Sequence, residues 1–117
     1  MGYIRNETIV VSSRSVDRLI KAHAMACHVF DNHGIGSLVS GVVQHRSNGG
    51  AAFFVSPDGS KEGWAESAAG DKARDELKKE LRANPDLYLD WAHIILGGDN
   101  GKFEVKDSPA EDKAEAA

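Results

Sequence analysis

The segment best equipped to bind a ligand is Pro-Asp-Gly-Ser-Lys-Glu-Gly-Trp at 57–64, which directly precedes a predicted helix. Backbone N–H groups at a helix start attract anions, and Ser60 and Lys61 add a hydroxyl and a positive charge. Trp64 adds a ring on which a base could stack. The Walker pattern Gly-x-x-x-x-Gly-Lys-Ser is absent. We therefore predict a phosphate or carboxylate site here, the alternative being a plain turn in which Trp64 covers the edge of the core.

The histidines and the single cysteine offer a weaker case for chemistry. His23 and Cys27 are spaced i and i+4, and His33 or His45 could complete a metal site with them. His23 and Cys27 also fall on the apolar face of a predicted helix, where buried histidine and free cysteine are common. We therefore predict no metal and no cofactor. His93 has no nucleophile-elbow or triad pattern around it, and no catalytic residue is assigned. A small enzyme using His93 or His45 remains an alternative.

A third group of polar residues flanks two predicted strands. Arg5 and Asn6 precede the apolar part of the first strand, while Arg46 and Asn48 lie in the hairpin between the second and third strands. The first and third strands of a split βαβ fold are neighbours, so we expect these side chains to converge at one end of the sheet. Arginine with asparagine could bind the phosphate and base of a nucleotide, whereas solvent-exposed capping is the alternative.

The elements that must position these residues follow from periodicity and turn signals. Apolar residues at helical spacing predict one helix from Val16 to about Asp31 and another from Glu66 or Asp71 to Arg82. Runs rich in β-branched and aromatic residues predict strands over 4–11, 38–45, 51–56, 87–96 and 103–105. The order predicts an α+β fold, a two-layer βαββαβ (ferredoxin-like) sandwich with an added C-terminal strand. Such a scaffold does not specify a function.

Length and charge narrow the class of protein. The chain of 117 residues is the size of one domain, predicted over 1–107, and 108–117 is predicted to be a disordered acidic tail. The net charge of −4 argues against DNA as a partner, because DNA-binding proteins usually carry excess positive charge. No apolar run approaches the ~20 residues of a membrane helix, and no signal peptide is evident. We therefore expect a cytoplasmic protein that is not bound to a membrane.

The predicted sheet has large apolar side chains on both faces. Along the fourth strand, alternation places Trp91, His93 and Ile95 on the face opposite to Ile94. We expect Trp91, Ile95 and one of Phe53 or Phe54 to lie on the face that the helices leave open. Because a monomer rarely exposes such a patch, we predict a homodimer through this face. The alternative is a ligand platform, with rings stacked on Trp91 or a phenylalanine.

Five segments together resemble a family of small accessory proteins encoded by tailed phages. They are 1–5, 9–11, 21–24, 53–64 and 89–91, and the resemblance extends over most of residues 1–101. The family brings no established activity and no catalytic residues with it. Small phage accessory proteins often counteract host defence by occluding an immune protein or by sequestering a nucleotide signal.

The resemblance implies a non-enzymatic binding protein that antagonises host antiviral defence in the host cytoplasm. The leading hypothesis is a sponge for a small anionic or nucleotide signal. The alternative is an inhibitor that binds a host defence protein through the open sheet or an acidic surface.

Overall fold

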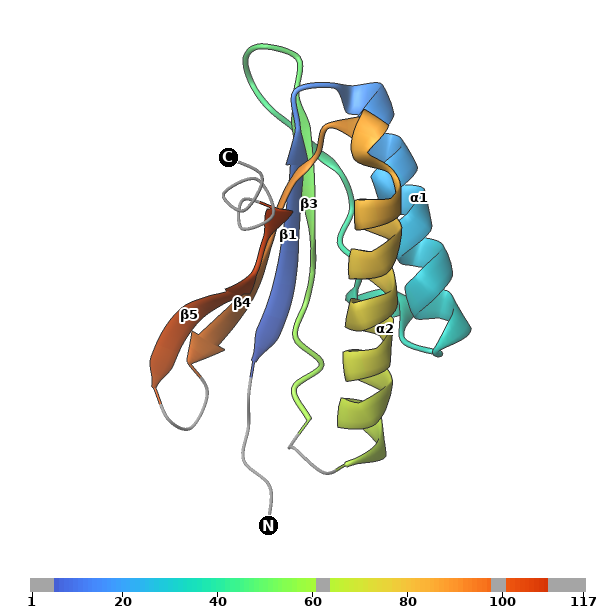
Figure 1. The fold of residues 1–117 in the computed structure, drawn as a ribbon, viewed down its shortest axis with the longest axis vertical. Coiled ribbons are helices and arrows are strands. Elements are labelled where there is room, and N and C mark those ends of the chain that lie inside the picture. Colours follow the sequence, from blue (N-terminus) through green and yellow to red (C-terminus); the bar gives the residue numbers. More distant parts are fainter. Residues whose placement is uncertain (1–5, 61–63, 98–100, 110–117) are drawn as a thin grey trace.

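The computed structural model describes residues 6–60, 64–97 and 101–109, and in these ranges two helices cover one face of a five-stranded antiparallel sheet (Figure 1). The order along the sheet is β2-β3-β1-β4-β5. The elements are β1 (Glu7–Ser13), α1 (Val16–Asn32), β2 (Val43–Gln44), β3 (Ala51–Val55), α2 (Ala65–Ala83), β4 (Asp90–Gly97) and β5 (Lys102–Asp107). Short 3-10 helices, η1 (Gly36–Leu38) and η2 (Pro85–Leu87), precede β2 and β4.

Helix α1 begins where its capping residues predict. The backbone of Ser15 is extended, and its Oγ accepts a hydrogen bond of 3.3 Å from the backbone N–H of Arg18. Asp17 lies in the first turn, where a negative charge suits the helix dipole. Leu19, Ala22, Ala26 and Phe30 of this helix are fully buried, whereas Ile20 of the predicted apolar stripe is 50% exposed. Both bounds of this helix therefore agree with the prediction.

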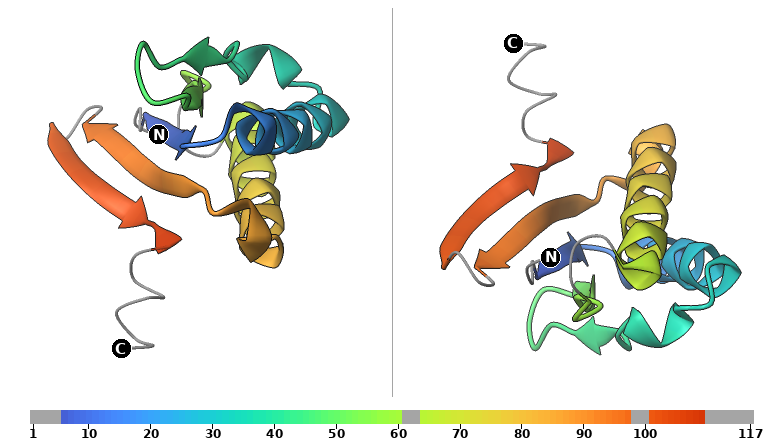
Figure 2. Two further views of the ribbon diagram at one scale, coloured as in Figure 1. Left: turned by 90° about the horizontal axis from the view of Figure 1, so that it is seen from above. Right: turned by 90° about the horizontal axis from the view of Figure 1, so that it is seen from below.

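Strand β1 lies in the middle of the sheet and organises the core. Val10 of β1 lies opposite Phe54 on β3 and opposite Ala92 on β4. Ile9 and Val11 are fully buried under the helices, whereas Val10 is exposed on the other face. Seen along the long axis of the molecule, both helices lie on the same side of the sheet, and β4 and β5 extend beyond them (Figure 2).

Two predicted strands are shorter than expected because local turns occupy their first residues. The second, predicted over 38–45, is reduced to β2 because η1 ends at Leu38, and Val39 makes only an isolated bridge to Val55. The fourth, predicted over 87–96, begins only at Asp90 because η2 and a left-handed residue at Tyr88 precede it. The predicted tail lies outside the described residues from 110 onward. No helix in the described ranges is long and apolar enough to cross a membrane.

Candidate functional site

In the loop before α2, Ser60 stabilises the turn through hydrogen bonds to Asp58. Ser60 is 4% exposed, and its hydroxyl donates a hydrogen bond of 2.6 Å to Oδ1 of Asp58. The backbone N–H of Ser60 donates to the same oxygen at 2.8 Å. Asp58 also lies against Gly70 of α2, where an added Cβ would overlap its carboxylate. The Ser60 hydroxyl therefore serves this turn; Trp64 is exposed, and Lys61 lies outside the described residues.

The prediction that Asn6 lies beside Arg46 and Asn48 at one end of the sheet is wrong. Asn6 directly precedes β1, whereas Arg46 lies in the hairpin that leads into Ala51, and Ala51 pairs with Ser13 at the far end of β1. Neighbouring strands in this sheet are antiparallel, so the start of β1 lies beside the end of β3 and away from the hairpin. Arg5 itself is outside the described ranges.

The placement of Trp91 and Ile95 on the open face is also wrong. These residues are 6% and 3% exposed, and they face the helices together with His93. The guanidinium of Arg82 on α2 lies over the Trp91 ring, 4.9 Å from its centre, and covers one face of that ring. Of the two phenylalanines on β3, Phe53 is buried and Phe54 is exposed. This agrees with the prediction that one of the two lies on the face that the helices leave open.

His93 belongs to a buried ionic cluster that the sequence did not reveal. Its Nε2 lies 2.8 Å from Oε1 of Glu7 on β1, and its Nδ1 lies 2.9 Å from Nζ of Lys78 on α2. Because the Lys78 ammonium can only donate, Nδ1 accepts its hydrogen bond and Nε2 donates to the Glu7 carboxylate. We call Glu7, His93, Lys78, Arg74 and Asp107, with the outer partners Lys106 and Arg82, the Glu7 cluster.

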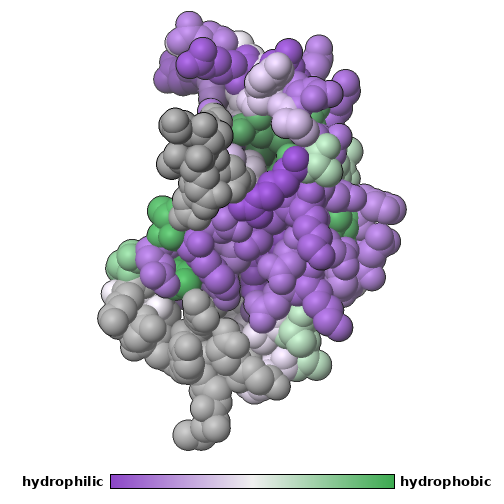
Figure 3. Space-filling model, viewed as in Figure 1, coloured by the Kyte–Doolittle hydropathy of each residue, from purple (hydrophilic) through white to green (hydrophobic). Residues whose placement is uncertain are grey.

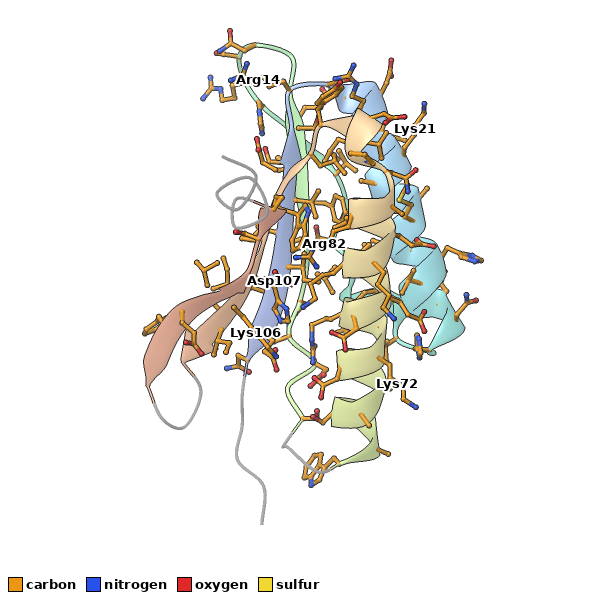
Figure 4. All side chains as sticks on the ribbon, in the orientation of Figure 1. Arg14, Lys21, Lys72, Arg82, Lys106 and Asp107 are labelled. Atoms are coloured by element: carbon orange, nitrogen blue, oxygen red, sulfur yellow. The ribbon has the colours of Figure 1, made fainter. Side chains whose placement is uncertain are left out.

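The outer part of the Glu7 cluster ties β5 to α2. Asp107 lies 2.6 Å from a guanidinium nitrogen of Arg82 and 3.3 Å from Nζ of Lys78. Lys106 Nζ lies 3.1 Å from the Glu7 carboxylate. A register shift between β4 and β5 allows the adjacent Lys106 and Asp107 both to face the cluster. Figure 4 shows Arg82, Lys106 and Asp107 between α2 and the β4–β5 hairpin.

The charges of the cluster set the protonation state of its central carboxylate. Burial alone raises the pKa of Glu7, but hydrogen bonds from His93 and Lys106 and the charge of Arg74 outweigh burial and lower that pKa to about 2. Burial likewise raises the pKa of Asp107, but bonds from Arg82 and Lys78 outweigh it and lower that pKa. Glu7 is 3% and His93 2% exposed, so the centre of the cluster is buried, and its hydrogen bonds and ion pairs join β1, β4 and β5 to α2.

His23 and Cys27 lie close together without forming a metal centre. The Cys27 sulfur is 3.8 Å from Nε2 of His23, and that nitrogen is also 2.8 Å from the carbonyl oxygen of Ser40. Burial, followed by the charge of Asp31, raises the pKa of the Cys27 thiol. No three His, Cys, Asp or Glu side chains gather as metal ligands within the ranges that the structure describes.

The helices leave the other face of the sheet uncovered, and we call it the helix-free face. Side chains directly opposite one another in neighbouring strands share a face, which assigns its members from the register. They are Val43, Ala52, Phe54, Thr8, Val10, Ser12, Asp90, Ala92, Ile94, Leu96, Val105 and Phe103. The only charged side chain among them, Asp90, lies at one end of its strand.

Large apolar groups on the helix-free face are open to solvent. Phe103 is 74% and Val105 59% exposed, and Phe54 is 45% exposed near the middle of the sheet. A shallow hollow of about 360 Å³ follows Val10, Ala52 and Phe54. Figure 3 shows a hydrophilic surface over α2, with hydrophobic atoms at the edge where β4 and β5 lie.

No family model, curated protein or solved structure gives a significant match to this chain.

Proposed function

We propose that the protein is a non-enzymatic binding protein that forms a homodimer through its helix-free face. The observation that carries the proposal is that, among residues 6–60, 64–97 and 101–109, nothing covers this broad apolar sheet face and Asp90 is its only charged side chain. Exposed apolar patches of this kind mark interaction sites. The element order and strand order support assigning the fold to the ferredoxin-like sandwiches, with β5 as the added strand.

A second copy is the partner that this surface fits best. In a two-fold interface each residue meets the same surface of its partner, so a charged face would repel itself and an uncharged one does not. Five strands about 4.8 Å apart and roughly six residues long give a footprint on the order of 500 Å² per copy. Two such footprints total about 1,000 Å², which reaches the lower limit for a specific interface.

The setting proposed for this dimer is antagonism of host antiviral defence by a phage. The resemblance of segments such as 53–64 to tailed-phage accessory proteins supports it, and binding without catalysis fits the enclosure of His93. Within that role, the protein either occludes a host immune protein or sequesters a nucleotide signal.

The test of self-association is the substitution Phe54→Glu. It places a charge in the middle of the proposed interface, close to its symmetry mate, so we expect a dimer to become a monomer at micromolar concentration in sedimentation equilibrium. Ile20→Glu is the matched control, because Ile20 is 50% exposed on α1 and lies away from the helix-free face. A wild-type protein that sediments as a monomer, or a Phe54→Glu variant that stays dimeric, contradicts the proposal.

A further inference from the structure

A polar cleft of about 350 Å³ lies at the end of the sheet where β1 leads into α1 and η2 leads into β4. It is lined by Ser13, Arg14, Arg18, Tyr88 and Asp90, and we call it the Arg14–Tyr88 cleft. The pairing of Ser12 with Asp90 brings its two chain segments together. Arg14 marks this end of the molecule in Figure 4. The volume of the cleft falls within the range of small-molecule sites.

The arginines of the cleft differ from those of the Glu7 cluster. Arg74 and Arg82 are held by carboxylates on α2, β5 and the loop before α2. Neither Arg14 nor Arg18 forms a salt bridge with any residue in the described ranges, and both are exposed. Guanidinium groups that line one cleft and form no salt bridge within the described residues are suited to a phosphate, which they can bind through several donors.

Tyr88 is held in a conformation that its own side chain disfavours. Its φ and ψ are both 50°, in the left-handed region, where a side chain crowds the backbone. The ring is 73% exposed, so burial does not compensate for this strain. The guanidinium of Arg18 lies 5.1 Å from the ring centre and orients the ring beside the cleft. The left-handed backbone of Tyr88 ends η2, where its N–H donates a hydrogen bond of 3.0 Å to the carbonyl oxygen of Pro85, and its exposed side chain lines the cleft.

We propose that the Arg14–Tyr88 cleft binds a mononucleotide. Arg14 and Arg18 hold the phosphate, and the base stacks on the Tyr88 ring. Asp90 would repel a simple anion, but its carboxylate can accept hydrogen bonds from the ribose hydroxyls of a nucleotide. The inference rests on the proposed binding role and gives it a ligand class, while it assigns the ligand to a place other than the loop 57–64.

The experiment is calorimetric titration of the full chain with AMP, inorganic phosphate and adenosine as separate probes. We expect AMP to bind more tightly than either fragment, because only AMP engages both the arginines and the ring. Arg14→Gln and Arg18→Gln should each weaken AMP binding by about tenfold or more, because each removes charge-assisted hydrogen bonds. Arg46→Gln is the matched control, since Arg46 is an exposed arginine outside the cleft.

The substitution Tyr88→Asn separates a ligand site from a structural feature. Asparagine tolerates the left-handed region, so the variant should melt roughly 2–5 °C higher than wild type while it binds AMP at least several-fold more weakly. Equal binding of AMP and phosphate, unchanged affinity in Arg14→Gln or Arg18→Gln, or unchanged affinity in Tyr88→Asn would overturn the assignment.

These variants leave the helix-free face intact, so sedimentation of the same samples tests self-association independently. A dimer that does not bind AMP contradicts only the cleft. A monomer that binds AMP contradicts only the proposed homodimer.

Discussion

Glu7→Gln is expected to lower the free energy of unfolding by about 3 kcal/mol at pH 7, measured by urea denaturation at a fixed protein concentration. The substitution keeps the shape of the side chain and removes the buried negative charge that His93, Lys106 and Arg74 surround. His93 and the buried Arg74 would then face a neutral amide instead of a carboxylate on β1, and removing one member of a buried ion pair is the costly way to break it.

The control for this substitution is Glu104→Gln. Glu104 is an exposed glutamate on β5, so its replacement should change the unfolding free energy by less than about 0.5 kcal/mol. If Glu7→Gln were as mild as this control, the Glu7 cluster would not be the lock between β1, β4 and α2.

The pH dependence of stability gives the same cluster a second measurement. The folded state lowers the pKa of Glu7 from 4.5 to about 2, so its contribution is complete above about pH 4.5 and is lost as the pH falls toward about 2. A shift of that size corresponds to about 3 kcal/mol. Wild type should therefore lose more stability than Glu7→Gln across this interval, although Asp107 titrates in both proteins.

Trp91→Ala is expected to reduce the unfolding free energy by about 3–5 kcal/mol, because it removes a large side chain from the core and leaves a cavity. Trp91 is 6% exposed beneath the helices, and the Arg82 guanidinium stacks over its ring. The effect should appear as global destabilisation in urea. Loss of dimerisation from a folded monomer would instead indicate that this ring lies at an interface.

The other tryptophan provides the matched comparison. Trp64 is 53% exposed before α2, so Trp64→Ala should cost less than about 1 kcal/mol. Fluorescence offers a second readout: the emission that remains in Trp64→Ala should be blue-shifted, because it comes from the buried Trp91. Similar energetic costs for the two substitutions would contradict the burial described for the core.

The helices and the α+β class were predictable because their signals are local. Ser15 marks the start of α1 by its capping oxygen, and the four-residue spacing of Ala73, Leu77 and Leu81 marks the buried side of α2. Alternation along β4 also placed Trp91 and Ile95 on the same face correctly. It could not say which face the helices cover, because both faces are apolar.

The Glu7 cluster was not predictable from the same patterns. Arg74 and Lys78 repeat every four residues beside the apolar stripe of α2, and such a row normally belongs to the solvated side of a helix. Their burial depends on Glu7, which lies far away in the sequence. The spacing of these two basic residues beside the apolar stripe was visible in the sequence. The carboxylate that neutralises them is brought close only by the tertiary fold.

The Arg14–Tyr88 cleft was missed for a related reason. Nothing local connects the Ser-Arg-Ser segment at 13–15 with Tyr88, and only the pairing of β1 with β4 brings them together. The left-handed backbone of Tyr88 also gave no signal, because glycine or asparagine is the residue that usually marks this conformation. Sequence reasoning selected the glycine-rich loop at 57–64 instead.

The central position of β1 has a consequence for how the chain folds as it is synthesised. Glu7 pairs with Ile95, so β1 cannot complete its hydrogen bonding until β4, which follows both helices in the sequence, has emerged. Contacts between such distant segments slow folding, because a long loop must close before they form. During translation, β1 can pack against α1 and then pair with β3, but its other edge stays unpaired until β4 is made. In that period a chaperone or another nascent chain can bind to the unpaired edge.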